Sequence, residues 1–267
     1  MNPLTSSYRL TFAALLATGF LGTSGLPVTA SSRLTSVQHS SPNPQSILVA
    51  GGLGFKLNVR SSRYRIGGFS RGSCPAVDIT AVSPPTRQEE RSPGNDVAVD
   101  STTSSHPMLF VNIPAELSGK TAEFSVQDEA GNQELYSTKF NLTGKPGIVG
   151  IRVANTASPL AVGQKYLWQV SVACEPGNSE NRLYASGWIE RVPLDSSLAT
   201  QIEKATLREK LDLFAKAGIW QDTLATLAEL RYTNPNDSAL AQDWASLMQT
   251  VNLNNFANQP IVQIAGQ

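Results

Sequence analysis

Histidine and cysteine are scarce in this chain of 267 residues, which has only His39, His106, Cys74 and Cys174. So few histidines limit metal binding and histidine-dependent acid–base catalysis. Structural zinc sites use four ligands, and two cysteines alone do not form one. We therefore expect no metal and no cofactor, and we favour a protein that is not an enzyme.

An excess of charge is also missing, because 21 basic residues balance 21 acidic ones and the isoelectric point is near 6.7. Nucleic-acid-binding domains usually carry a basic face, so the composition argues against a nucleic-acid partner. The sequence contains no Gly-x-Ser-x-Gly elbow and no glycine-rich phosphate-binding loop between a strand and a helix. The neighbours Asp128 and Glu129 would point to opposite faces of a strand, so they do not make a ready acid–base pair.

Long apolar runs are absent as well, and the only apolar segment of note lies at the N-terminus. Residues 10–21 are apolar, follow a polar start that carries Arg9, and precede the small residues Val28-Thr29-Ala30. This layout predicts a secretory signal peptide over residues 1–30, because a bilayer span needs about 20 apolar residues. An uncleaved anchor is the alternative. We expect export to the periplasm, the cell envelope or the extracellular space, with no stable membrane span after cleavage.

Export bears on the two cysteines that remain. In an oxidising compartment two lone cysteines usually pair, so we predict a disulfide between Cys74 and Cys174. Closing a loop of about 100 residues would stabilise the fold by roughly 4–5 kcal/mol in the chain-entropy description. Two separate buried thiols are the alternative.

The folded part begins after a polar segment. Residues 31–68 are rich in Ser, Pro, Asn, Gly and Arg and show little periodicity, which predicts a disordered linker. Its locally basic residues 60–68 either stay solvated, which we favour, or contact an anionic polymer or headgroup. Residues 83–105 are rich in Pro, Ser, Thr and charge, and we expect a disordered loop there.

Apolar residues alternate with polar ones in about seven short segments between residues 77 and 192, separated by Gly- and Pro-containing breaks. Alternation gives each strand one buried and one wet face. The pattern predicts a mainly β fold over residues 69–192, an antiparallel β-sandwich of the immunoglobulin-like kind. The alternating segments cover residues 77–81, 109–113, 124–126, 136–142, 149–153, 166–174 and 184–192.

A helical period follows, and it predicts a small α-helical subdomain over residues 193–251. Thr200 and Glu203 have the spacing of a capping box, and Gly218 fits a helix C-terminus. The spacing of Phe214, Gly218, Trp220 and Pro235 resembles one tetratricopeptide-type hairpin, and a single repeat cannot bury its own face. The helices therefore either pack on the sandwich, which we favour, or bind a partner. We expect residues 252–267 to form a flexible tail.

A candidate interaction surface is formed by Arg71, His106, Trp188 and Arg191. Aromatic and arginine side chains are common in interaction hot spots. For Trp188 we favour packing in the core over exposure to a partner. For His106, which precedes a proline at the start of a strand, we favour a structural role over that of a ligand.

A series of short motifs runs through the β region in a fixed order. The motifs are Arg71-Gly72-Ser73-Cys74-Pro75, His106-Pro107, Ala122-Glu123-Phe124, Pro146-Gly147-Ile148, Tyr166, Trp168 and Gly187-Trp188-Ile189-Glu190-Arg191. This series resembles the cyanobacterial family catalogued as domain of unknown function 928, over roughly residues 69–192 with a helical tail. The resemblance implies an exported cyanobacterial protein and brings no activity with it.

Taken together, these features favour a non-enzymatic binding module of the periplasm or cell envelope with a protein partner. The resemblance to a sandwich fold carries no function by itself. A structural component of the envelope is one alternative. A hydrolase is the other, and it would need a cleft that collects Asp128, Glu129, Glu190 or His106.

Overall fold

The structure is a computed structural model that describes residues 53–55, 60–62, 74–85, 97–175 and 181–266. These residues belong to one compact unit, residues 45–267. The predicted signal peptide over residues 1–30 and the candidate residue Arg71 lie outside the described residues. Among the described residues, no helix combines the length and the apolar character needed to cross a bilayer.

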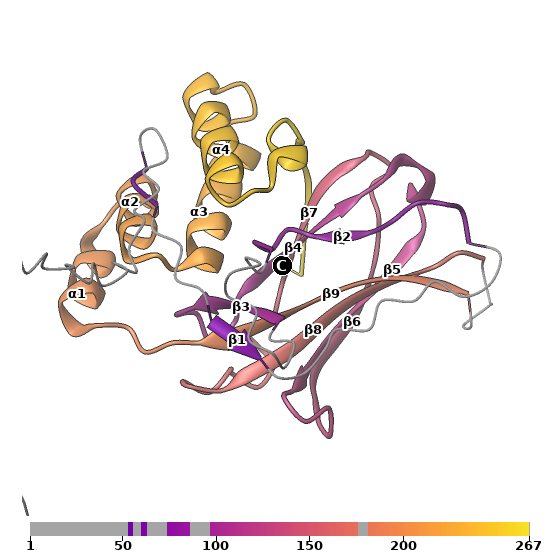
Figure 1. Ribbon diagram of the computed structural model, residues 1–267, viewed down its shortest axis with the longest axis horizontal. Coiled ribbons are helices and arrows are strands. Elements are labelled where there is room, and N and C mark those ends of the chain that lie inside the picture. Colours follow the sequence, from indigo (N-terminus) through magenta and orange to yellow (C-terminus); the bar gives the residue numbers. More distant parts are fainter. Residues whose placement is uncertain (1–52, 56–59, 63–73, 86–96, 176–180, 267) are drawn as a thin grey trace, which may run out of the picture. The chain divides into compact units, whose positions relative to one another are not determined.

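Ten strands of the described chain form two sheets (Figure 1). The first sheet has the order β1-β3-β9-β8-β5-β6, and the second has the order β10-β7-β4-β2. The strands of the first sheet are β1 Arg60–Ser62, β3 Val97–Thr102, β9 Arg182–Arg191, β8 Lys165–Ala173, β5 Thr121–Asp128 and β6 Glu134–Asn141. Those of the second are β10 Ile261–Ala265, β7 Gly147–Arg152, β4 Met108–Ile113 and β2 Thr80–Ala81.

The mainly β fold with a C-terminal helical region is confirmed, but the prediction of purely antiparallel sheets is wrong. β3 pairs with β9 in parallel, and β10 pairs with β7 in parallel. Both parallel strands come from segments that were expected to lack structure, residues 83–105 and 252–267. β10 returns to the sheet after the helices, and such a long crossover is the connection that a parallel pair requires.

The two sheets share one apolar core, which we name the inter-sheet core. It takes alternate residues from β4 and β7 of the second sheet and from β5, β8 and β9 of the first. Trp168 of β8 is buried against Gly187 of β9, where a Cβ atom would lie 2.7 Å from the indole ring. The inward residues include Leu109, Val111, Val149, Ile151, Phe124, Val126, Trp168, Val170, Leu183 and Ile189.

Four helices follow the last strand of the first sheet: α1 Ser196–Lys204, α2 Leu207–Ala217, α3 Trp220–Thr233 and α4 Ser238–Thr250. Residues of α2, α3 and α4 form a second apolar cluster with Met108, Phe110 and Ile148 on the far face of the second sheet. Alternation explains the division, because Leu109 and Val111 of β4 face the inter-sheet core while Met108 and Phe110 face the helices. Packing of the helices on the sheets is therefore the correct alternative for α2, α3 and α4. α1 differs, since none of its residues is buried.

The predicted capping box was placed one helix too early. Asp195 accepts hydrogen bonds from the backbone N–H groups of Ser197 and Leu198 and starts α1, so Thr200 lies inside that helix. The capping box occurs at the start of α2, between Thr206 and Glu209. Gly218 ends α2 with φ of 70°, which confirms the predicted C-terminal stop.

The described parts of two segments that were predicted to be loose are packed. In the predicted tail, a short 3-10 helix, Asn254–Phe256, precedes β10, and the Trp244 Nε1 group donates to the Phe256 carbonyl at 2.9 Å. In the predicted linker, Leu53 and Phe55 are buried in the helix–sheet cluster, and β1 pairs with β3. Isolated apolar residues within polar segments supply these contacts, and they are too few to produce a periodic pattern.

Candidate functional site

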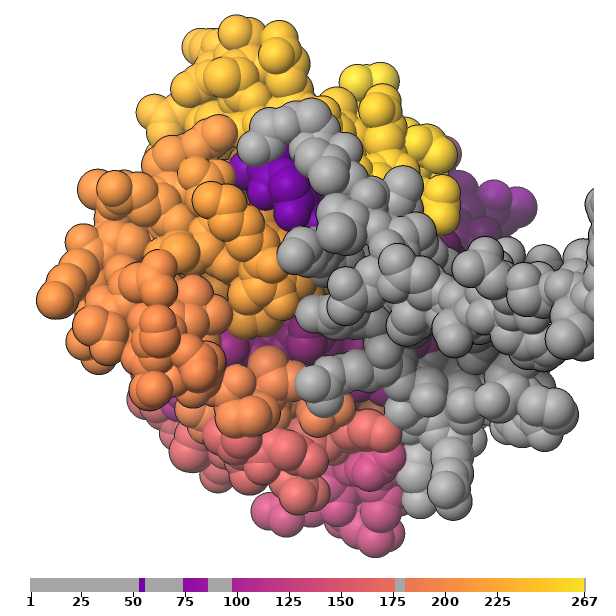
Figure 2. Space-filling model, turned by 60° about the vertical axis from the view of Figure 1, so that its left-hand side comes forward, coloured from indigo at the N-terminus to yellow at the C-terminus, as the bar shows by residue number. Residues whose placement is uncertain are grey.

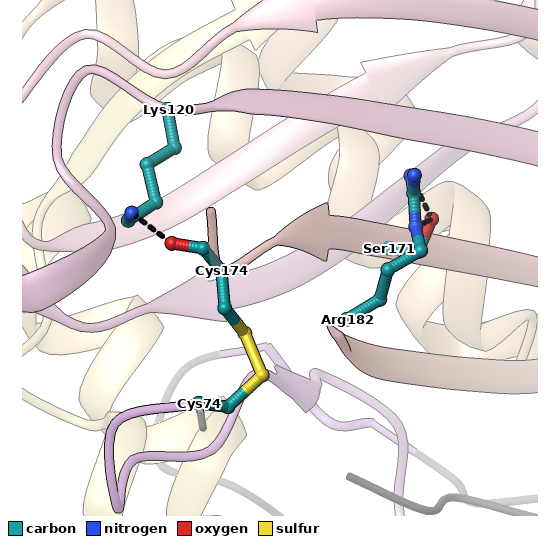
Figure 3. Close-up of a disulfide and its surroundings, with 5 residues drawn as sticks. All are labelled: Cys74, Lys120, Ser171, Cys174 and Arg182. Atoms are coloured by element: carbon teal, nitrogen blue, oxygen red, sulfur yellow. Dashed lines mark hydrogen bonds between the residues drawn. A yellow bond between two sulfur atoms is a disulfide. The ribbon is translucent and has the colours of Figure 1, made fainter. Parts of the chain in front are cut away.

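The predicted disulfide is confirmed, with Cys74 and Cys174 joined across a sequence separation of 100 residues (Figure 3). Cys174 follows the last residue of β8 in the first sheet, and Cys74 precedes β2 of the second sheet. The bond therefore links the two sheets at one end of the inter-sheet core. The Lys120 Nζ group donates to the Cys174 carbonyl at 2.7 Å, so the backbone beside the sulfur is also held.

His106 has a structural setting. Its Nδ1 atom lies 3.0 Å from Ser105 Oγ, and its Nε2 atom lies 3.0 Å from the Ala157 carbonyl oxygen. The backbone N–H of His106 donates to Ser104 Oγ. Both ring nitrogens are thus engaged in tying the start of β4 to the loop after β7, which agrees with the structural role favoured from the sequence.

Arg191 and Trp188 do not form an open surface. The Arg191 guanidinium donates to the Leu160 carbonyl through Nη1 at 2.6 Å and to the Thr103 carbonyl through Nε at 3.2 Å. Trp188 is 2% exposed, so its ring is not available to a partner. Because the next residue, Ile189, belongs to the inter-sheet core, alternation places Trp188 on the other face of β9.

Two carboxylates of the hydrolase hypothesis lie two strands apart, because β8 separates Asp128 of β5 from Glu190 of β9. The Asp128 Oδ1 atom accepts from the backbone N–H groups of Asn132 and Gln133, at 2.7 and 3.1 Å, and so fixes the turn between β5 and β6. Glu129 belongs to the same turn, and Glu190 lies in β9. Among the described residues, no three His, Cys, Asp or Glu side chains are grouped as a metal ion would require.

Six polar side chains lie where α3 meets β3 and β4, and we name them the polar seam: Ser83, Asp100, Thr102, Thr103, Gln221 and Asp222. Asp100, Thr102, Gln221 and Asp222 are buried, and Ser83 and Thr103 are half-buried. Asp222 lies in the first turn of α3, where the helix dipole favours negative charge. It accepts bonds from the Thr102 and Thr103 hydroxyls and, at 2.8 Å, from the Thr103 backbone N–H. Burial raises the pKa of Asp222 above its ordinary value, although these bonds act in the lowering direction.

Asp100 is the second carboxyl of the polar seam. It lies on β3, is 5% exposed, and accepts a hydrogen bond from Ser83 Oγ at 2.7 Å. Burial raises the pKa of Asp100 to about 7, against the lowering effect of the Ser83 bond. A carboxyl with such a pKa can exchange a proton at neutral pH, but general acid–base catalysis also needs a substrate within hydrogen-bond reach. The burial of Asp100 denies it that contact in this structure.

An open groove of about 460 Å³ lies between α1 and α2. Figure 2 shows this region of the surface in orange, with the two helices exposed. The groove combines an apolar floor with side chains of both charges, and it includes none of the residues predicted from the sequence. Its lining residues are Gln201, Lys204, Ala205, Glu209, Asp212, Leu213 and Lys216.

Sequence reasoning missed the polar seam and the groove for different reasons. Asp100 and Thr102 stand in a segment of loop-like composition, and the alternating valines Val97 and Val99 were the available sign of a strand. The groove depends on the angle between two short helices, and the apolar period within each helix gives no information about that angle. The Glu209 side chain accepts a hydrogen bond from the Thr206 backbone N–H, and this bond lowers the pKa of Glu209. The pair lies at the start of α2, at one end of the groove.

Comparison with known families adds one finding. A family model described as Domain of Unknown Function (DUF928) matches residues 66–261 of this chain. The match extends beyond the β region through all four helices to the start of β10. It thus includes the expected residues 69–192 and the expected helical tail. No curated protein matches the chain.

Proposed function

Since the chain belongs to the Domain of Unknown Function (DUF928) family, whose description names no activity, we propose a function from the geometry. The chain is a non-enzymatic module that binds a protein partner, and it acts after export in the periplasm or cell envelope. The groove between α1 and α2 is its binding site.

The observation that carries this proposal is the unusual position of α1. The helix has apolar and polar residues on separate faces, yet none of its residues is buried. α2, in contrast, buries Leu211 and Ala215 against the rest of the protein. An amphipathic helix usually covers its apolar face, and the apolar residues Leu198 and Ile202 of α1 are only half-buried. A further segment of polypeptide that lay in the groove beside Gln201 and Lys204 would extend the cover of this helix.

The lining of the groove indicates the chemistry of that segment. Lys204 and Lys216 are balanced by Glu209 and Asp212, and Leu213 supplies apolar surface between them. A balanced set of charges does not favour nucleic acid or an anionic lipid surface, which bind patches of one positive sign. It fits a peptide that offers an apolar side chain flanked by one acidic and one basic residue.

Two features support an exported location. Residues 10–21 have the composition of a signal-peptide core. The disulfide between Cys74 and Cys174 is of a kind that persists in oxidising compartments. An immunoglobulin-like assignment for the two sheets and a tetratricopeptide-like assignment for the α2–α3 hairpin remain predictions.

A displayed library of random peptides, selected on the purified full chain, tests the groove. We expect enriched peptides to carry an apolar residue between charges of opposite sign, and to lose at least about tenfold in affinity for Leu213→Glu. Val162→Glu is the matched control, because Val162 is 50% exposed and lies outside the groove. Peptides that bind Leu213→Glu as tightly as the unmodified chain would refute the assignment.

A further inference from the structure

β6 forms one edge of the six-stranded sheet. It is the last strand in the order, and its only partner strand in the described chain is β5. The backbone N–H of Leu142 donates to the Lys120 carbonyl at 2.9 Å, so the backbone groups of Leu142 point toward β5. Since backbone groups alternate along a strand, those of Ser137, Lys139 and Asn141 point away from the sheet.

One end of this edge already binds an amide group. The side chain of Gln263, on β10, accepts from the Thr143 backbone N–H at 3.1 Å and donates to the Asn141 carbonyl at 3.0 Å. An amide that bonds these two backbone groups takes the place of a peptide group in a neighbouring strand. At the other end, the pairing with β5 is irregular between Val126 and Gln127. Bulges and local caps of this kind limit the pairing of an edge. Residues 136–140 lie between the two, and no other described strand pairs with their outer side.

The side chains of this segment leave aromatic surface at the margin of the inter-sheet core. Tyr136 and Phe140 pack against that core and are only partly buried. The Tyr136 ring lies 6.0 Å from the Phe124 ring, in an edge-to-face arrangement. On the opposite face of the strand, Ser137 and Lys139 are exposed.

We propose that β6 pairs with β6 of a second copy of this chain, antiparallel and about a two-fold axis at Thr138, to form a symmetric dimer. In this register Ser137 lies opposite Lys139 of the second copy, and each of these pairs exchanges both backbone hydrogen bonds. Tyr136 lies opposite the second copy's Phe140, and the reverse pair is equivalent by symmetry. Two aromatic pairs thereby cover the partly exposed rings.

Charge selects this register over its neighbours. A two-fold axis at Lys139 would place Lys139 opposite its own copy, and like charges directly opposite are destabilising. An axis at Ser137 would place Phe140 opposite Glu134 and leave Tyr136 opposite Thr138. The axis at Thr138 avoids both and alone brings the aromatic rings together.

Cysteine variants of the full chain test the axis directly. Residues opposite each other at a non-hydrogen-bonded position have Cα atoms about 4.5 Å apart, within disulfide range. We expect Thr138→Cys to form a covalent dimer on mild oxidation, while Ser137→Cys and Lys139→Cys do not. A covalent dimer of either control alone, or of none of the variants, overturns the proposal.

Sedimentation of exposed-site variants gives a test that does not depend on new thiols. The unmodified chain should sediment with twice the monomer mass at high concentration. Ser137→Lys places a lysine opposite Lys139 of the second copy and should weaken the dimer by about tenfold. The double variant Ser137→Lys/Lys139→Glu should restore it. A monomer at all concentrations, or equal dissociation of all three proteins, overturns the proposal. Leu213→Glu should dimerise normally, so failure here is separate from failure at the groove.

Discussion

Two of the interfaces within this fold differ in composition. The inter-sheet core is apolar throughout and is closed at one end by the disulfide between Cys74 and Cys174. The interface between the first sheet and α3 contains the polar seam, with Asp100 and Asp222 both buried. The first interface is non-directional, because apolar burial depends on area. The second depends on hydrogen bonds of specified geometry, which fix how α3 meets β3.

This contrast predicts different responses to perturbation. A buried apolar core tolerates conservative changes in shape, with losses spread over many contacts. A buried carboxyl tolerates little, because removing one member leaves the others desolvated and without a partner. The helix–sheet interface should therefore be sensitive to single polar substitutions and to pH, and the inter-sheet core should be sensitive to the loss of its covalent link.

The largest expected effect is on the inter-sheet core. Replacing both Cys74 and Cys174 by Ala should lower the free energy of unfolding by about 4–5 kcal/mol, since the lost bond closes a loop of about 100 residues in the unfolded chain. Urea unfolding of the oxidised chain and the double variant measures the difference. Reductant should have no further effect on the double variant. A loss below about 1 kcal/mol would show that apolar burial alone holds the sheets together.

The next effect concerns Asp222 in the polar seam. Asp222→Ala removes the acceptor of both Thr102 and Thr103 and should cost about 3 kcal/mol of unfolding free energy. Asp222→Asn keeps one acceptor oxygen and the volume, and should cost about 1 kcal/mol. Glu203→Ala, at an exposed position of α1, is the control and should change stability by less than about 0.5 kcal/mol. Equal losses for Ala and Asn would mean that charge, rather than bonding, holds α3 to β3.

The same contrast explains how far the sequence could predict the fold. Alternation in residues 166–174 and 184–192 placed β8 and β9, and it correctly assigned Trp168 to a buried face. The pairing of Cys74 with Cys174 followed from their number and the expected compartment. These features depend on apolar period and composition, which each segment carries within itself.

The polar seam could not be predicted in this way. Asp100 is separated from Asp222 by more than a hundred residues, and each looks like a solvated charge in its own segment. Their burial depends on the parallel pairing of β3 with β9, which places Thr102 beside Arg191 and under the start of α3. The groove between α1 and α2 was missed for a related reason, because the true capping box at Thr206 divides one expected helix into two.

The smallest of these effects is the pH response of Asp100. Burial raises its pKa to about 7 in the folded chain, from 3.8 for an ordinary aspartate. The folded state therefore binds the proton more tightly, so the stabilising contribution of this group is complete below pH 3.8 and is lost as pH rises through 7. Asp100→Asn carries no charge and keeps an acceptor for Ser83. It should gain about 2 kcal/mol relative to the unmodified chain between about pH 5 and about pH 7.

Urea unfolding of both proteins across this pH range measures the difference, in which the titration of Asp222 cancels because it is common to both. Glu203→Gln serves as the control and should follow the unmodified chain. A constant difference between Asp100→Asn and the unmodified chain at all pH values would mean that Asp100 is solvated in solution. The polar seam would then be open at β3, and its resistance to pH would resemble that of the inter-sheet core. If the difference in unfolding free energy instead grows with pH, the desolvated charge lies at Asp100. Replacing this one carboxyl by a neutral amide then strengthens the interface between β3 and α3 without altering its packing.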